Sequence, residues 1–166
     1  YFADRGVIYA RYSDDIILFA EDFETLQLYR AKLLEFIDQY QLEVNPSKER
    51  IYTPEEPYEF LGFKCGDNSI DISQAGVEKM KGKIRRKMRA LLRWKERKGA
   101  SAERAMRSLI NYFNRKFYDT DLEDTLTWSR WYFPVITSSD ALRQIDHYLH
   151  NRAFLPPLFL ILLQVT

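Results

Sequence analysis

Short apolar and polar blocks alternate along the first part of the chain, a pattern typical of β-strands joined by turns. Apart from Arg11, residues 7–12 and 16–20 are apolar, aromatic or β-branched, and only Ser13, Asp14 and Asp15 separate them. This pattern predicts an antiparallel hairpin with acidic residues at its turn.

A helix and further strands are expected after this hairpin. Asp22 can cap a helix over residues 23–40, where apolar residues recur at helical spacing. Proline and glycine then divide the chain into short apolar segments. The strands expected there are residues 42–44, residues 51–52, and a second hairpin of residues 58–64 and 69–72.

The second half of the chain has the apolar periodicity of helices. Ser73 can cap a helix that ends at Gly99, and Ser101 can cap another that extends to about residue 117. A third helix is expected at residues 139–151. An aromatic cluster, Trp128, Trp131, Tyr132 and Phe133, precedes this last helix and is expected to pack into the core.

The composition agrees with a folded protein of one or two small domains. Of the 166 residues, 46% are hydrophobic and 30% are charged, which excludes a disordered or collagenous chain. The single cysteine excludes an internal disulfide, and the two histidines provide no set of zinc-ligand spacings, so we expect a reducing, cytoplasmic setting. The longest apolar run, residues 155–165, contains two prolines and is shorter than the ~18 residues that span a bilayer, so no membrane partner is expected.

Charge is distributed unevenly along the chain. Residues 79–98 contain 11 basic residues and one acid, Glu96, although the whole chain has a net charge of only +1. Such a dense cluster is typical of a surface that binds phosphates. A solvated helix without a partner is the alternative.

The pair Asp14 and Asp15 is the strongest candidate for chemistry. Two adjacent carboxylates on a tight turn suit hard cations such as Mg²⁺, which take oxygen ligands and are often shared with substrate phosphates. The alternative is that both residues only favour the turn, as aspartate often does.

The segment around this pair, Tyr-Ala-Arg-Tyr-Ser-Asp-Asp-Ile-Ile-Leu-Phe at residues 9–19, resembles the Tyr-x-Asp-Asp hairpin of reverse transcriptases, most closely the bacterial group II intron type. Leu-Glu-Val-Asn-Pro-Ser-Lys at residues 42–48 is similar to the next motif of that family, and Tyr-Glu-Phe-Leu-Gly-Phe at residues 58–63 is similar to its primer-grip hairpin. The resemblance covers about residues 1–152. It implies an α+β fold: the C-terminal part of a right-hand polymerase palm, with antiparallel hairpins and a helix, followed by an all-helical thumb.

The resemblance also assigns roles to individual residues. Asp14 and Asp15 would be catalytic metal ligands, and Lys48, also catalytic, would lie close to the leaving pyrophosphate. The expected primer and nucleotide contacts are Tyr12, Ser13, Phe60, Leu61 and Gly62. The expected contacts to the nucleic-acid backbone, in the basic thumb helix, are Lys81, Arg85, Arg86 and Arg89. For Lys48 the alternative is an ordinary turn lysine. For Phe60, Leu61 and Gly62 it is a hairpin that packs against the core, and for Phe60 both roles can hold.

The implied protein is an RNA-directed DNA polymerase, a nucleotidyltransferase of the bacterial cytoplasm. It would use two Mg²⁺ ions, an RNA template, a DNA primer and deoxynucleoside triphosphates, with intron RNA as a further partner in the group II type. The domains expected are a partial palm at residues 1–73, a three-helix thumb at 74–152 and an atypical apolar tail at 153–166. The fingers and an upstream palm aspartate of the family have no counterpart here, so we expect the fragment alone to be inactive.

A second reading belongs to a different class. The chain would be a non-catalytic RNA-binding module or a maturase-like remnant, in which the basic helix binds nucleic acid and the aspartates do no chemistry. Retron and phage-defence reverse transcriptases share the Tyr-x-Asp-Asp hairpin, so the motif leaves the lineage open.

Overall fold

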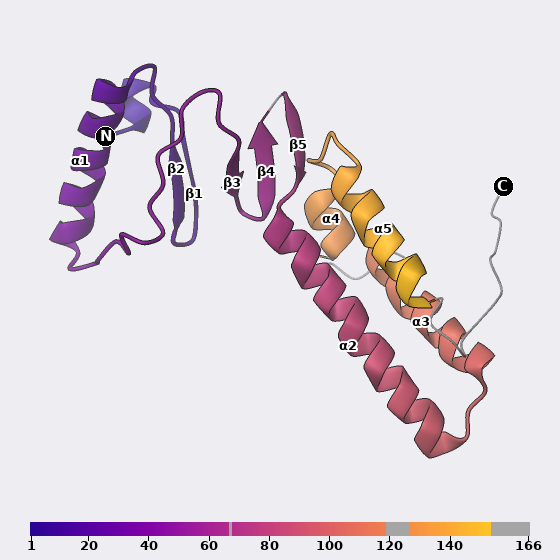
Figure 1. The fold of residues 1–166 in the computed structure, drawn as a ribbon. Helices are drawn as coiled ribbons and strands as arrows, with labels where there is room; N and C mark the ends of the chain where they lie inside the picture. Colours follow the sequence, from indigo (N-terminus) through magenta and orange to yellow (C-terminus); the bar gives the residue numbers. More distant parts are fainter. Residues whose placement is uncertain (67, 119–126, 154–166) are drawn as a thin grey trace. The chain divides into compact units, whose positions relative to one another are not determined.

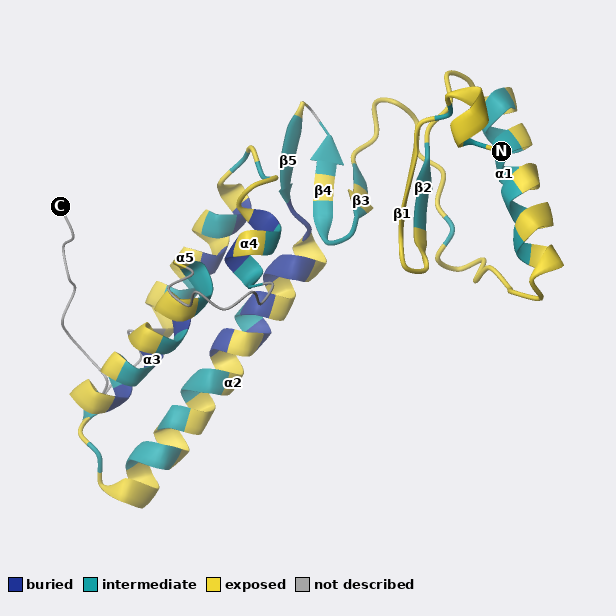
Figure 2. Ribbon diagram, turned by 180° about the vertical axis from the view of Figure 1, so that it is seen from behind, coloured by how far each residue is buried: buried dark blue, intermediate teal, exposed yellow. Residues whose placement is uncertain are grey.

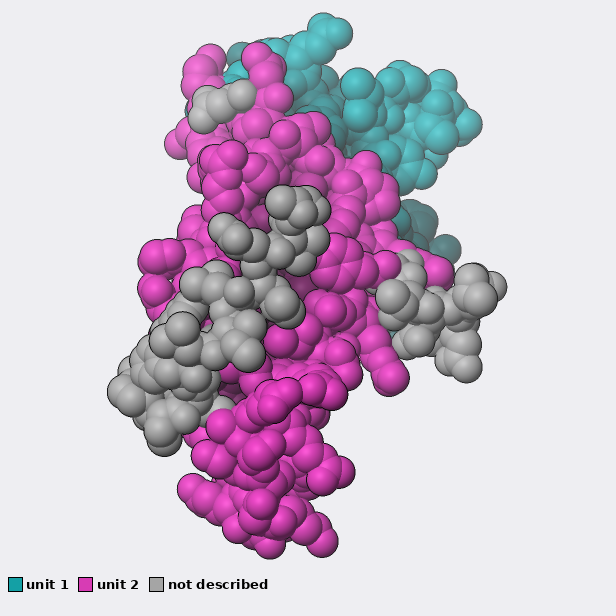
Figure 3. All heavy atoms as spheres, turned by 90° about the vertical axis from the view of Figure 1, so that its right-hand side faces the viewer, with its two compact units in different colours: residues 1–54 teal, residues 55–166 magenta. Residues whose placement is uncertain are grey.

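The computed structural model describes residues 1–66, 68–118 and 127–153, which form an α+β fold of antiparallel hairpins and helices (Figure 1). The chain divides into two compact units, unit 1 at residues 1–54 and unit 2 at residues 55–166 (Figure 3). The functional division expected at residue 73 stays a prediction. None of the helices within the described ranges is long and apolar enough to cross a membrane.

Unit 1 contains the first predicted hairpin and the first predicted helix. Its elements are the 3₁₀ turn η1 (Ala3–Arg5), the strands β1 (Tyr9–Tyr12) and β2 (Asp15–Leu18), and the helix α1 (Phe23–Gln39). The strands pair antiparallel. The carboxylate of Asp22 caps α1 by accepting the Thr25 N–H at 2.7 Å, which lowers the pKa of Asp22. Both elements are therefore confirmed.

Unit 1 has little core of its own. None of its residues is buried (Figure 2). Large apolar side chains, such as Ile8 just before β1 and Phe36 on α1, are more than half exposed. The strands expected at residues 42–44 and 51–52 do not form, so that prediction was wrong. A strand needs a neighbouring strand for its backbone hydrogen bonds, and in the described chain neither segment has one.

Unit 2 begins with a three-stranded antiparallel sheet in the order β3 (Tyr58–Phe60), β4 (Phe63–Gly66) and β5 (Ser69–Ile72). Residues 58–64 had been expected to form one strand. They form parts of two strands instead, because the chain reverses at Leu61 and Gly62, whose φ angles are 52° and 86°. A strand cannot continue through two residues of left-handed backbone.

The helices of unit 2 are α2 (Gln74–Lys98), α3 (Ala102–Phe117), α4 (Trp128–Tyr132) and α5 (Asp140–Ala153). Ser73 caps α2 by accepting the Gly76 N–H at 3.1 Å, and Gly99 ends that helix with a φ of 58°. Ser101 caps α3 in the same way. The three long helices confirm the sequence prediction, whereas α4 was not expected.

The core of unit 2 lies where the sheet meets the first turns of α2. Val77, Met80 and Ile84 of α2 are at most 1% exposed, and they cluster with Ile72 of β5 and residues of α3, α4 and α5 (Figure 2). The predicted packing of the aromatic cluster is confirmed for Tyr132, which is buried, and for Trp128 and Trp131, which pack against the core. It was wrong for Phe133, which is 42% exposed because it follows the last residue of α4 and its ring meets that of Trp128 edge to face. This core holds the sheet and the four helices together as one unit.

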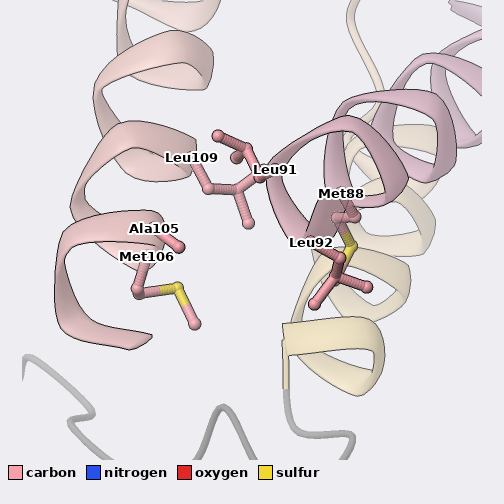
Figure 4. Close-up of a pocket in the computed structure, with 6 residues that line it drawn as sticks. All are labelled: Met88, Leu91, Leu92, Ala105, Met106 and Leu109. Atoms are coloured by element: carbon pink, nitrogen blue, oxygen red, sulfur yellow. The ribbon is translucent and has the colours of Figure 1, made fainter. Parts of the chain in front are cut away.

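A small gap lies between the C-terminal half of α2 and the N-terminal half of α3. Met88, Leu91 and Leu92 of α2 face Ala105, Met106 and Leu109 of α3 across a gap of about 20 Å³ (Figure 4). That volume holds about one water molecule. The two helices are therefore in apolar contact here and enclose no ligand-sized cavity.

Candidate active site

The two aspartates lie at a strained hairpin turn. Tyr12 and Asp15 are the last paired residues of β1 and β2, so Ser13 and Asp14 form a two-residue loop. Ser13 has a φ of 57°, and the Arg11 Nε donates a 2.8 Å hydrogen bond to its carbonyl oxygen. Left-handed backbone at a residue other than glycine costs about 1 kcal/mol or more and tends to occur at functional sites. Arg11 helps to hold this conformation.

The Asp15 side chain lies on the face of the hairpin away from α1. Tyr9 on β1 has its ring 5.6 Å from that of Phe2, which in turn contacts the Tyr29 ring of α1 at 6.0 Å. Side chains alternate between the two faces of a strand, so Tyr12 and its partner Asp15 lie on the opposite face. The turn therefore presents a carboxylate on a face that α1 leaves open.

The donor set of this turn fits Mg²⁺ as a partial site. Asp14 and Asp15 are exposed, and neither carboxylate forms an ion pair or a side-chain hydrogen bond with the described residues. Carboxylate oxygens are the ligands that Mg²⁺ prefers, and it commonly uses one or two of them together with water and substrate phosphates. Within the described ranges no three His, Cys, Asp or Glu side chains are placed to hold one ion together. The two aspartates can thus supply part of a coordination shell.

Lys48 ends a tight turn that is attached to α1. Its backbone N–H donates to the Asn45 carbonyl oxygen at 3.0 Å, and its side chain is exposed. The next residue, Glu49, forms a two-pronged ion pair with Arg30 of α1, which lowers the pKa of Glu49. The Arg30–Glu49 pair ties this segment to the helix, while Lys48 is left accessible to a ligand.

The three residues expected to hold the primer belong to unit 2, whereas Asp14, Asp15 and Lys48 belong to unit 1. Phe60 ends β3, and Leu61 and Gly62 form the turn to β4. All three are half-buried. The turn is in contact with α4, whose Trp131 and Tyr132 were expected only as core residues. An aromatic cluster just before a proline was the available sequence signal for this contact.

The basic residues of α2 differ in how free they are. Lys81 is 19% exposed, its Nζ lies 2.9 Å from Glu78 and 5.9 Å from the centre of the Tyr148 ring, and it is therefore engaged within unit 2. Arg85, Arg86 and Arg89 are exposed. They are better placed than Lys81 to meet phosphates.

Two further cations share the outward face of α2 with Arg86. Lys79 and Arg93 are exposed and lie seven residues before and after Arg86, which is two helical turns in each direction. Both belong to the basic cluster of residues 79–98, but the resemblance assigned neither of them a role. The exposed basic surface of α2 thus extends beyond the four residues that the resemblance assigned, within the expected cluster of residues 79–98.

Comparison with known proteins gives one match. No curated protein and no solved structure matches the chain significantly. Residues 2–65 match the family model described as "Reverse transcriptase (RNA-dependent DNA polymerase)". The matched segment includes the aspartate turn, Lys48 and the turn at Leu61 and Gly62. Over these residues the chain is similar to reverse transcriptases, the RNA-dependent DNA polymerases.

Proposed function

We propose that this chain is part of an RNA-dependent DNA polymerase that extends a DNA primer on an RNA template by two-metal nucleotidyl transfer. The observation that carries the proposal is the exposed turn with Asp14 and Asp15, which lies inside the segment similar to reverse transcriptases. Asp14 and Asp15 hold Mg²⁺, and Tyr12 and Ser13 lie near the primer end and the incoming nucleotide. The bound metal supplies activation of the primer hydroxyl and charge stabilisation of the leaving oxygens.

Lys48 in this proposal offsets charge on the leaving pyrophosphate or donates a proton to it. The exposed apolar side chains of unit 1 support the proposal that unit 1 packs against further polypeptide of the same polymerase. That polypeptide would provide the additional aspartate that two shared ions require. The 166-residue chain alone is then expected to be catalytically inactive.

The resemblance of residues 9–19 further leads us to propose a group II intron-encoded, maturase-type enzyme of the bacterial cytoplasm. Its partners would be intron RNA, a primed template and deoxynucleoside triphosphates.

Metal binding at the turn can be tested on the chain itself with Mn²⁺ as a paramagnetic substitute for Mg²⁺. We expect Mn²⁺ to broaden the amide NMR signals of residues 12–16 first, because a bound ion lies close to them. Asp14→Asn should remove this selective broadening. Asp38→Asn, which removes an exposed carboxylate from the end of α1, is the matched control. Equal broadening in wild type and Asp14→Asn would contradict metal binding at Asp14.

Duplex binding by α2 gives a second test. Replacing Arg85, Arg86 and Arg89 with Gln should weaken binding to an RNA–DNA duplex on the order of 10- to 100-fold at low salt. The slope of log affinity against log salt should flatten by about 2 to 3, since each phosphate contact contributes roughly 0.9 on duplex DNA. Fluorescence anisotropy over a salt series measures both quantities.

The control for that test replaces three cations that already have carboxylate partners: Lys32→Gln, Arg107→Gln and Arg143→Gln. The change in net charge is the same, so a general charge effect would weaken both variants equally. That result would contradict a specific role for the surface of α2.

A second candidate function is nucleic-acid binding without catalysis. It is favoured by the fact that the basic helix belongs to unit 2, which has its own core, whereas unit 1 has no buried residue. Unit 2 could then bind a duplex whether or not the aspartate turn performs chemistry. The two functions differ in whether replacing Asp14 stops primer extension.

A further inference from the structure

The turn at Leu61 and Gly62 is contacted from the side by two consecutive aromatic residues of α4. The indole Nε1 of Trp131 donates a 3.4 Å hydrogen bond to the Leu61 carbonyl oxygen. The Tyr132 hydroxyl lies only 2.7 Å from the position that a Cβ on Gly62 would occupy. Both rings also contact Phe63, at centroid distances of 6.1 and 5.1 Å. The side chains of Trp131 and Tyr132 thus contact the backbone of the turn and also the Phe63 side chain that follows it.

This turn needs support because its backbone is strained. Leu61 is a bulky residue with a φ of 52°, a conformation that costs about 1 to 3 kcal/mol. On its other side the Gly62 carbonyl oxygen accepts the Ser73 N–H at 2.8 Å, which ties the turn to the start of α2. The turn is therefore held between the N-cap of α2 and the aromatic pair of α4.

Tyr132 fits this place only because two glycines leave room for it. Its hydroxyl is also 3.2 Å from the position that a Cβ on Gly76 would take. Burial raises the pKa of Tyr132, so the phenol keeps its proton at physiological pH. The contact between a neutral hydroxyl and two glycine backbones sets the distance between α4, the turn and α2.

We propose that α4 is a positioning element, in which Trp131 and Tyr132 hold the Leu61–Gly62 turn in the shape that contacts the 3′ end of the primer. The inference rests on the proposed function, which assigns primer contact to this turn. Trp131 and Tyr132 act through the turn and do not themselves touch the primer.

The test compares binding of the 166-residue chain to two fluorescent RNA–DNA duplexes. One duplex has a recessed primer 3′ end, and in the other both ends are closed by hairpin loops. The measured quantity is the ratio of the two affinities, which we call the end preference. Duplex binding by α2 contributes to both affinities, so the end preference isolates the turn.

Tyr132→Phe is expected to change the end preference in opposite directions in the wild-type chain and in the Gly62→Ala variant. Tyr132→Phe in the wild-type chain should lower the end preference about 3- to 10-fold, because the atom that touches Gly62 is removed. Gly62→Ala should lower it at least as much, since the new Cβ collides with the Tyr132 hydroxyl at a residue whose φ is 86°. In the double variant, Tyr132→Phe relieves the collision and should partly restore the end preference. Tyr118→Phe, at an exposed tyrosine, is the control and should change nothing.

Relief of the collision also restores stability, so thermal melting of each variant identifies chains that fail to fold, and the end preference is compared only among variants that fold. If Gly62→Ala does not fold, Trp131→Phe provides the second measurement and should also lower the end preference. Unchanged end preference in both Tyr132→Phe and Trp131→Phe would overturn the positioning role, while the proposed primer contact would stand. Equal affinity of the wild-type chain for the two duplexes would instead contradict primer contact by the turn, and the positioning role would fall with it.

Discussion

Asp14→Asn is expected to abolish primer extension by the proposed polymerase. The substitution keeps the size of the side chain and removes one carboxylate from the proposed metal site. Charge stabilisation by a catalytic metal is worth several kcal/mol, so the rate should fall by a factor on the order of 1,000 or more. Single-turnover extension of a DNA primer on an RNA template with Mg²⁺ measures it.

Two comparisons make this prediction specific. Affinity for the template–primer should change little, because the basic surface of α2 lies in the other unit of the chain. Asp38→Asn, at an exposed aspartate of α1, should extend the primer at the wild-type rate. Extension by Asp14→Asn at a near wild-type rate would favour the non-catalytic binding module.

Ile84→Ala is expected to destabilise unit 2 by about 2 to 5 kcal/mol. Ile84 is 0% exposed and lies in the cluster that joins α2 to the sheet and the other helices, so truncating it leaves a cavity at the centre of the core. Urea denaturation followed by circular dichroism measures the free energy of unfolding.

The matched control for this change is Lys83→Ala, one residue earlier on α2 and exposed, which should shift stability by less than about 0.5 kcal/mol. An Ile84→Ala effect of the same small size would show that the cluster does not hold unit 2 together. Leu28→Ala in α1 is a useful contrast, because that side chain is 54% exposed and its loss should cost little in this chain.

Backbone strain is common to the turns at Ser13 and Leu61. Ser13 and Leu61 both have left-handed φ angles without being glycine, and both occupy the turn of a hairpin within the segment similar to reverse transcriptases. In each case a hydrogen bond from a side chain, Arg11 or Trp131, ends on the carbonyl oxygen of the loop. Strained backbone persists where surrounding contacts over-determine it.

Elements whose signals are local could be predicted from the sequence. Asp22, Ser73 and Ser101 accept the backbone N–H groups expected of N-caps, and Gly99 ends α2 in left-handed backbone. Each of these interactions joins residues only a few positions apart, so the sequence contains both partners side by side. The same holds for the acidic turn, whose flanking strands pair with each other.

Elements that depend on distant partners required the tertiary structure. Residues 42–44 are apolar enough for a strand but have no neighbouring strand in the described chain, and sequence pattern alone cannot supply one. The turn at Gly62 and the short helix α4 meet although about seventy residues separate them in the sequence. The Tyr132 hydroxyl lies so close to Gly62 that only a glycine fits there.

The candidate site divides in the same way. Residue types and spacing selected Asp14, Asp15 and the basic helix, whereas the family resemblance selected Lys48. Which cations of that helix are free was decided by packing, since Lys81 meets Tyr148 of α5 only after the helices associate. The sequence determines the chemistry of a side chain, but its accessibility depends on neighbours that folding brings from elsewhere in the chain.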